Sequence, residues 1–307
     1  MKNNNEEYVP KHASNYSANC SLNDNIQTNG QVVRRKKKRR RVKNWVWNVL
    51  IIFFLLIIIG VLVLLWFWHK DNVDTSKVSD DISKDIKIIE REDDDNTELI
   101  GSSNEEETSD YWYYIKFSLY DVDIQKLKEK NADTVGWINV NNTNINYPYV
   151  QYRDNDYYLN HSFDKSYNEA GWVFMDYRNR SDLNNKNTIL YAHSRLDKTM
   201  FGSLSKVLKK EWYTNKDNHI IRISTEKDNT LWQIFSVYKI KEESYYITTD
   251  FASDSSYMDF LNTIKSRSIY NFNTNLTTED RILTLSTCYS DSERTVVHAK
   301  LIKRSSK

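Results

Sequence analysis

The chain has 307 residues and carries 43 Lys and Arg against 42 Asp and Glu, so its net charge of +1 identifies no class of charged partner. Its two cysteines, Cys20 and Cys288, exclude a fold that depends on a network of disulfides. The charges are distributed unevenly, however, and they divide the chain into four segments.

Residues 45–68 form an uninterrupted apolar run. Its 24 residues carry no charge and one polar side chain, Asn48. At about 1.5 Å per residue, such a helix crosses a hydrocarbon core of roughly 30 Å. Tryptophans mark both ends, where indole rings favour the membrane interface: Trp45, Trp47, Trp66 and Trp68. A buried core helix rarely runs so long without a charge, and no cleavage site follows, so we expect a transmembrane helix rather than a core helix or a signal peptide.

The segments on either side of this run are strongly charged. Nine of the ten residues at 34–43 are basic. Such a block could bind nucleic acid, but beside a membrane span it favours retention in the cytoplasm. We therefore expect residues 1–44 to be a cytoplasmic basic segment with no nucleic-acid partner. Residues 69–110 are acidic and lack strong apolar periodicity, which predicts a flexible extracytoplasmic tether, with a short helix possible near 78–89.

Residues 111–307 are long enough for one globular domain without disulfides. Runs of β-branched and aromatic residues predict eight strands, at 135–140, 145–151, 170–176, 187–193, 219–225, 231–240, 281–288 and 295–303. Three segments have helical spacing: 121–131, 199–210 and 254–268. Many strands and few helices indicate a mostly β domain, either a closed barrel or a sandwich.

The strand at 281–288, RILTLSTC, ends at the domain's one cysteine. Its alternation gives an apolar face with Leu283, Leu285 and Thr287 and a polar face with Thr284, Ser286 and Cys288. We expect the first face to be core and the second to be the polar floor of a groove. Cys20 lies on the other side of the membrane, so Cys288 is a reactive thiol, an intermolecular disulfide or a small buried hydrophobe.

A thiol nucleophile needs a base or proton donor. The domain offers His161, His193, His219 and His298. His193 ends a strand and opens a loop, where functional side chains often lie. His298 shares a strand face with Arg294, about 13 Å away. The pattern favours His193 without excluding His298. Arg294 itself could bind an oxyanion near the thiol, or pair with Glu293 or Asp291.

Several of these motifs together resemble the sortase family, and its class B in particular. They are TLSTC with an arginine opening the next strand, NTILYAHSRLDKTMFGSL upstream, RTVVHAKLIK, DNDYYL, AGWVFMD and a helical segment before the cysteine strand. The resemblance covers residues 111–307. It implies a closed eight-stranded β-barrel with peripheral helices, preceded by the single N-terminal transmembrane helix.

The resemblance also implies a cysteine transpeptidase. Cys288 matches the nucleophile, His193 the acid/base and Arg294 the oxyanion or substrate-positioning group. Ser286, Asn155 and Leu159 match positions that contact the sorting peptide, and Tyr246 and Ile247 fall where a loop would wall the groove. The connection from Cys288 to Arg294, YSDSE, is shorter than in many class B members, which puts contacts from that loop in doubt.

Implied partners are secreted proteins with a C-terminal sorting signal resembling NPxTN or LPxTG, and an amine of a peptidoglycan precursor or cross-bridge. The implied location is the cell membrane of a Gram-positive envelope, with the catalytic domain outside. Three alternatives stay open: a pilin-polymerising enzyme that uses a lysine amine, an inactive tethered peptide-binding module and a cysteine hydrolase. Nothing in the sequence calls for a metal or another cofactor.

Overall fold

The computed structural model describes residues 43–307 except 102, 104, 108, 242 and 289–292, and of Cys288 it describes the backbone alone. Cys20, Asp291 and nearly all of the basic segment thus lie outside the described residues. The chain forms two units, residues 1–59 and 60–307. The helix α1 (Asn44–Asp85) begins in the first unit and ends in the second, and its length and apolar composition are sufficient to cross a membrane.

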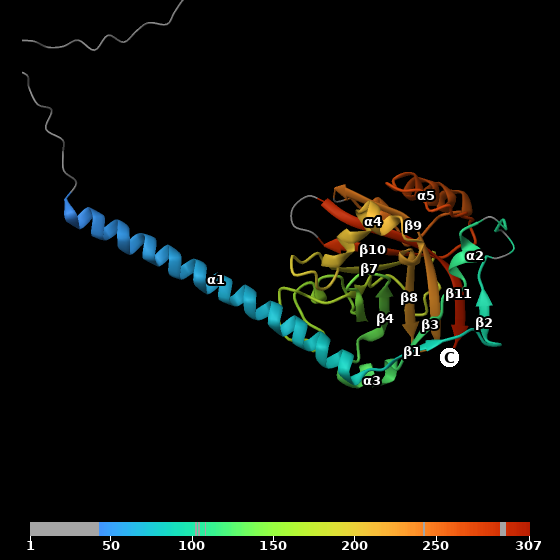
Figure 1. The fold of residues 1–307 in the computed structure, drawn as a ribbon, viewed down its shortest axis with the longest axis horizontal. Helices are drawn as coiled ribbons and strands as arrows, with labels where there is room; N and C mark the ends of the chain where they lie inside the picture. The colour runs from blue at the N-terminus through green and yellow to red at the C-terminus, as the bar shows by residue number, and fades with distance from the viewer. Residues whose placement is uncertain (1–42, 102, 104, 108, 242, 289–292) are drawn as a thin grey trace, which may run out of the picture. The chain divides into compact units, whose positions relative to one another are not determined.

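Eight strands of the second unit form a closed barrel (Figure 1). Their order is β10-β7-β6-β5-β4-β8-β9-β11, and β11 pairs again with β10. They are β4 (Thr134–Val140), β5 (Asn146–Gln151), β6 (Phe174–Met175), β7 (Asn187–His193), β8 (Ile220–Thr225), β9 (Asp228–Lys241), β10 (Ile282–Cys288) and β11 (Glu293–Ser306). Each falls on one of the eight predicted runs, so the mostly β fold and its eight-stranded barrel are confirmed.

The barrel encloses an apolar core. Trp137, Trp172 and Trp232 are fully buried in it, together with the inward side chains Leu283 and Leu285 of β10. Large aromatic side chains bury roughly 150–250 Å² each, which accounts for much of the driving force of folding. The apolar face predicted for β10 therefore does face the core.

Helices lie around the barrel, and the main one is α5 (Asp254–Ser266). It begins at a capping box made by Ser253 and Ser256 and packs Phe260 and Ile264 in a second apolar cluster with Phe235 of β9. Of the other predicted helices, 121–131 contains α3 (Ile124–Lys130), whereas 199–210 forms the 3₁₀ helix η3 (Gly202–Leu208) followed by α4 (Lys210–Tyr213). The remaining short helices are α2 (Tyr111–Tyr114), η2 (Tyr157–Leu159), η4 (Lys216–Asn218) and η5 (Tyr245–Ile247).

Residues 69–110 differ from the flexible tether that we expected. α1 continues to Asp85, β1 (Ile88–Arg91) pairs with β3 (Leu119–Val122), and β2 (Thr97–Leu99) pairs with β11. Ile82, only 3% exposed, packs in the core cluster of the barrel. The charge balance of the segment does not predict this packing, because the packing depends on apolar contacts and strand pairings with the rest of the domain.

We expect a chain that begins at Tyr111 to melt roughly 10 °C below one that begins at His69. The shorter chain loses the buried side chains Ile82 and Ile86, each worth about 1.5–3 kcal/mol, and a stabilisation of this size shifts the midpoint by about 2–4 °C per kcal/mol. Differential scanning calorimetry of the two chains measures the difference. Equal melting temperatures would mean that residues 69–110 contribute nothing to the fold.

Candidate active site

The ends of β7, β10 and β11 meet at the predicted site. β10 runs parallel to β7, and their register pairs Cys288 directly with His193. Neighbouring strands lie about 4.8 Å apart, so the backbones of these two residues are adjacent. β10 and β11 are antiparallel, their ladder ends with Ser286 opposite Val296, and Arg294 lies two residues further towards this end on β11. Cys288 and His193, 95 residues apart in sequence, thus lie side by side at one end of the barrel, and Arg294 lies at the same end.

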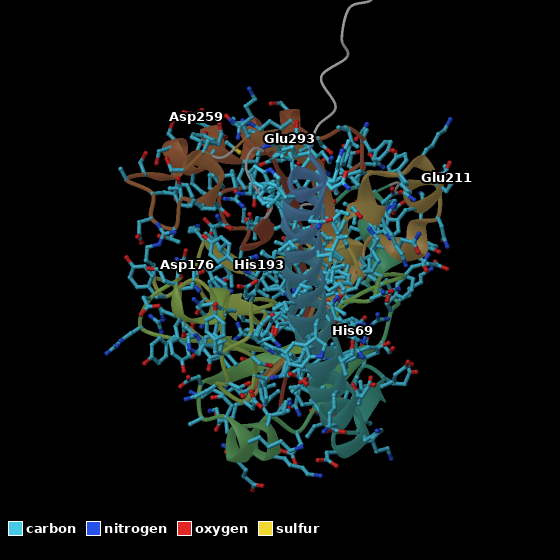
Figure 2. The ribbon with its side chains drawn as sticks, turned by 90° about the vertical axis from the view of Figure 1, so that its left-hand side faces the viewer. His69, Asp176, His193, Glu211, Asp259 and Glu293 are labelled. Carbon is cyan, nitrogen blue, oxygen red and sulfur yellow. The ribbon has the colours of Figure 1, made fainter. Side chains whose placement is uncertain are left out.

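His193, labelled in Figure 2, is the last residue of β7 and is partly buried. Its Nε2 lies 2.7 Å from the carbonyl oxygen of Leu159. A carbonyl only accepts hydrogen bonds, so Nε2 carries a proton and Nδ1 is the nitrogen that exchanges one. Gly171, at φ +59°, leaves room for this carbonyl, because a Cβ there would stand 2.7 Å from the Leu159 oxygen.

Beneath the site, the buried carboxylate of Asp176 connects several elements. Arg178 donates to it from Nε and from its terminal nitrogen, at 2.8 and 2.6 Å, and the Tyr191 hydroxyl donates at 2.9 Å. Burial raises the pKa of Asp176, but the hydrogen bonds from Arg178 and Tyr191 outweigh it and hold that pKa below its usual value. Asp176 is therefore an anion that fixes the strand carrying His193.

Two of the predicted peptide-contacting residues, Asn155 and Ile247, are tied to the same group. The Asn155 amide nitrogen donates to Asp176 at 3.1 Å, and Arg178 donates at 3.1 Å to the carbonyl of Ile247. Sequence analysis missed Asp176 and Arg178. The available signal was an acid and an arginine two residues apart at the end of a predicted strand.

The remaining predicted contacts occupy different positions. Leu159 ends η2 and is partly buried, with its carbonyl bonded to His193. Tyr246, in η5, is only 3% exposed and shares a 3.0 Å hydrogen bond with the hydroxyl of Ser286, itself 2% exposed. The open polar floor that we expected along β10 is therefore wrong for Ser286 and for the fully buried Thr284. The reason is that η5 and α5 cover this face of the strand.

His298 lies under this cover and is fully buried. The Thr284 hydroxyl is 2.7 Å from the Asn187 side-chain oxygen, to which it donates, so Thr284 accepts from Nδ1 of His298 at 2.9 Å. Nε2 then accepts from the Tyr238 hydroxyl at 2.8 Å. Burial, with a smaller contribution from the charge of Arg267, lowers the pKa of His298 to about 3. His298 is thus a neutral structural histidine.

The other two histidines of the domain also have structural partners. His219 is buried, accepts from the Tyr114 hydroxyl at Nδ1 and donates from Nε2 to the carbonyl of Tyr213. Burial lowers its pKa to about 4. His161 stacks on Tyr157 and hydrogen-bonds its carbonyl oxygen at 2.7 Å.

The two neutral buried histidines predict acid sensitivity. An unfolded histidine titrates near pH 6.5, whereas His219 and His298 bind protons in the folded state only near pH 4 and 3. Their contribution to stability is complete above about pH 6.5 and declines as the pH falls, by about 1.4 kcal/mol per unit for each histidine. Urea unfolding at pH 7.5, 6.5 and 5.5 measures this slope, and His298→Gln should make it shallower. An unchanged slope in that variant would contradict the assignment.

Arg294 is the second residue of β11, where its backbone pairs with Ile240 and its side chain is partly buried. Just after it, the Thr295 amide donates to the hydroxyl of Thr287, at 2.9 Å, rather than to the backbone of β10. Two acids were considered as partners of Arg294. Asp291 lies outside the described residues, and Glu293 lies 3.7 Å from the ammonium of Lys239.

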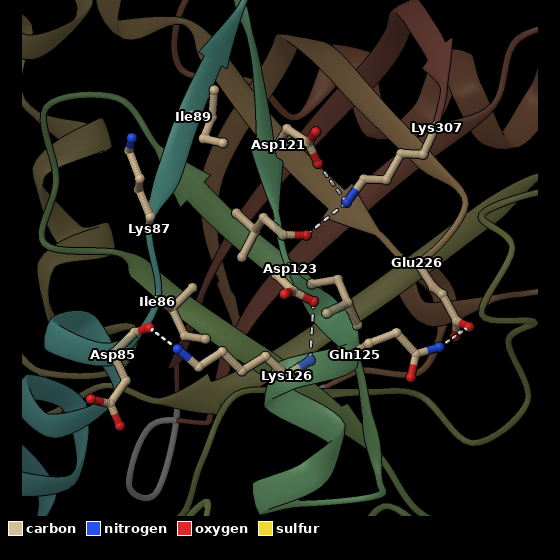
Figure 3. A pocket seen from close by; sticks show the side chains of 12 residues that line it. Asp85, Ile86, Lys87, Ile89, Asp121, Asp123, Gln125, Lys126, Glu226 and Lys307 are labelled. Carbon is tan, nitrogen blue, oxygen red and sulfur yellow. Dashed lines mark hydrogen bonds and ion pairs between the residues drawn. The ribbon is translucent and has the colours of Figure 1, made fainter.

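One pocket among the described residues contains His193. It is lined by the loop that follows, including Arg195, Leu196 and Asp197, and by Trp68 and Asn72 of α1. Another pocket, where α1 ends beside α3, is lined mostly by charged side chains, and Lys307 lies 2.8 Å from Asp121 within it (Figure 3). Lys307 follows the opposite end of the 14-residue β11 from Arg294, so this second pocket is remote from the candidate site.

Comparison with known proteins identifies the fold. The sortase domain model matches residues 138–302. The chain is 43% identical over 135 residues to sortase B of Staphylococcus aureus (strain NCTC 8325 / PS 47), and 35% identical over 138 residues to sortase B of Listeria monocytogenes serovar 1/2a. Each match covers 43% of this chain and about half, 54%, of the relative.

Solved structures agree with this. A Bacillus anthracis protein similar to sortase B is 44% identical, with a TM-score of 0.55 over 59% of this chain and 82% of that one. A Staphylococcus aureus sortase B–substrate complex is 40% identical, with a TM-score of 0.56 over 59% of this chain and 84% of the other. Since the family model spans more than half of the sequence and these likenesses all point to class B, the chain belongs to the sortase family and is a sortase B-like member of it.

Proposed function

We propose that this chain is a membrane-anchored cysteine transpeptidase, which cuts a C-terminal sorting signal after its threonine and transfers the acyl group to a cell-wall amine. The observation that carries the proposal is the register pairing Cys288 with His193, with Arg294 opening the adjoining strand. A nucleophile, a proton carrier and a fixed cation are the groups that acyl transfer through a thioester needs.

The first step forms the acyl enzyme. The Cys288 thiolate attacks the threonine carbonyl of the sorting signal, and the Arg294 guanidinium stabilises the negative charge that develops on its oxygen. The C–N bond breaks, and His193 gives its Nδ1 proton to the leaving amine. Nε2 stays bonded to Leu159 throughout, so the ring keeps its orientation.

The second step releases the product. An acceptor amine attacks the thioester carbonyl and loses a proton to Nδ1 of His193, the C–S bond breaks, and the thiolate returns as a new amide forms. One of the solved sortase B structures is a complex with triglycine. That likeness supports a small, amine-bearing peptide as acceptor, such as the cross-bridge or precursor of peptidoglycan.

The sorting peptide would lie between η2 and η5. Leu159 ends η2, Asn155 lies two residues before η2 begins, and Tyr246 and Ile247 belong to η5. Their bonded partners are Asp176, His193, Ser286 and Arg178. Ser286 acts in this arrangement by positioning Tyr246. A signal of the NPxTN type, or one resembling LPxTG, is the substrate we propose, with the basic N-terminus in the cytoplasm and the barrel outside.

The test uses the full chain in detergent micelles with a peptide containing an NPxTN signal, with and without triglycine, and mass spectrometry of the products. We expect cleavage after threonine and a threonyl-triglycine adduct, both lost in Cys288→Ala. Cleavage that survives in Cys288→Ala would refute the thioester mechanism. Hydrolysis alone, with triglycine present, would indicate a hydrolase instead.

A further inference from the structure

The second half of α1 lies on the barrel through one stripe of side chains. Trp68 and Asn72 line the pocket of His193, Thr75 is 1% exposed, and Ile82 and Ile86 are in the core cluster. Trp68, Asn72, Thr75 and Ile82 are separated by three, four or seven residues, so they share one face of the helix, and Ile86 follows directly after its last residue, Asp85. The Asn168 amide fixes the middle of the stripe by donating to Thr75 Oγ1 at 3.1 Å and to the Asp71 carbonyl at 3.3 Å.

No spacer separates the apolar run from the part of α1 that contacts the domain. The uncharged residues of the span end at Trp68, and Trp68 is also the first α1 residue in the His193 pocket. A bilayer whose interface lies at Trp66 and Trp68, as the aromatic ends of the run indicate, would therefore reach the domain at that pocket.

The loop 194–199 of the domain lies next to Trp68, because its residues Arg195, Leu196 and Asp197 line the same pocket. Leu196 is 81% exposed, the most exposed large apolar side chain among those described. A single exposed leucine needs no explanation. This one, however, lines the same pocket as Trp68 and stands among polar and charged neighbours, Arg195, Asp197 and Lys198. Arg195 and Asp197 pair with each other at 3.4 Å, and Lys198 adds a positive charge beside the apolar tip, a combination that the interface of lipid headgroups accommodates.

From this arrangement we infer that the loop 194–199 contacts the lipid bilayer, with Leu196 in the interface, and holds the His193 end of the barrel against the membrane. The inference rests on the membrane anchoring of the proposed function, but not on its chemistry. The acidic segment 69–110 then packs along the domain instead of acting as a spacer between the domain and the membrane.

The test places an environment-sensitive fluorophore, NBD, at Leu196→Cys in the full chain, with Cys20→Ser and Cys288→Ala to remove the other thiols. The protein is reconstituted in phosphatidylcholine–phosphatidylglycerol nanodiscs, with and without a lipid that carries a doxyl quencher near the headgroup. Ile89→Cys is the matched control: it is 49% exposed and lies beyond the end of α1, about 26 Å or more along the helix from Trp68.

We expect at least twofold stronger quenching and a blue-shifted emission at position 196 relative to position 89. Inserting Gly-Gly-Ser after His69 should bring the quenching at 196 down to that of the control. Equal quenching at the two positions would overturn the inference, as would quenching at 196 that the insertion leaves unchanged. Because the labelled protein lacks Cys288, failure here leaves the peptide-cleavage test of the proposed function unaffected.

Discussion

His193→Ala is expected to lower the rate of acyl transfer by about 10²- to 10⁴-fold, the usual effect of removing a positioned acid/base group, with the fold unchanged. His193 is half-buried at a strand end, and its register partner is Cys288. The substitution also removes the hydrogen bond from Nε2 to the Leu159 carbonyl, which should lower the free energy of unfolding by about 0.5–1.5 kcal/mol without changing the fold. Steady-state formation of the triglycine adduct measures the loss.

His298→Gln is the matched control, because it changes the other histidine that the sequence pattern offered as the base. We expect its turnover to stay within about threefold of the parent chain, while the free energy of unfolding falls by about 1–3 kcal/mol. The loss arises because Thr284 and Tyr238 would keep buried hydroxyls without their partner. A His298→Gln protein that is stable but inactive, beside an active His193→Ala, would reverse the assignment.

These two histidines illustrate which features of the candidate site the sequence predicts and which it does not. Alternating apolar residues located all eight barrel strands, because the period of a strand is a local property. Whether a strand's second face is open or covered is decided by segments far away in sequence. From the sequence alone, Ser286 and His298 are candidates for an open groove, but in the folded domain η5 and α5 cover them. The register of β10 with β7, which pairs Cys288 with His193, likewise appears only in the folded sheet.

The acidic segment 69–110 was misjudged for a related reason. Its composition predicts disorder only if its carboxylates stay in water. Two cations of β11 instead hold two of them: Lys303 lies 2.6 Å from Asp93, and Lys300 lies 2.6 Å from Glu105. The resemblance to sortases pointed to Cys288, His193 and Arg294 as candidate catalytic residues. No sequence motif indicated Asp176, because its partners lie on separate segments of the chain.

Lys300→Met is expected to lower the free energy of unfolding at pH 7.5 by about 3–5 kcal/mol, the usual effect of breaking a buried ion pair from one side. The Lys300 side chain is 1% exposed, as is that of Glu105, and a second carboxylate, Asp280, lies 3.5 Å away. Its ammonium also donates to the carbonyl of Asn275 at 2.9 Å. Methionine fills a similar volume, so the loss reports the missing charge and not a cavity.

The pH dependence of this loss distinguishes a charge effect from a packing effect. Burial raises the pKa of Asp280 above its usual value, although Lys300 opposes that shift. A carboxyl with a raised folded pKa favours the folded state in acid and loses that advantage as the pH rises through the pKa. Without the lysine the pKa rises further, so the loss in Lys300→Met should be smaller at pH 5 than at pH 7.5, as measured by urea unfolding.

Lys84→Met is the control for this experiment, because Lys84 also has an acidic neighbour, Asp81 at 3.8 Å, but both side chains are more than half exposed. Exposed pairs contribute about 0–1 kcal/mol, so this variant should unfold almost as the parent does. Amide hydrogen exchange adds a local readout: if the Lys300–Glu105 pair holds the N-terminal segment on the barrel, Lys300→Met should speed exchange at Leu99 and Ile100 before it affects β4. A loss in Lys300→Met no larger than in Lys84→Met would show that the segment is held by its apolar contacts alone.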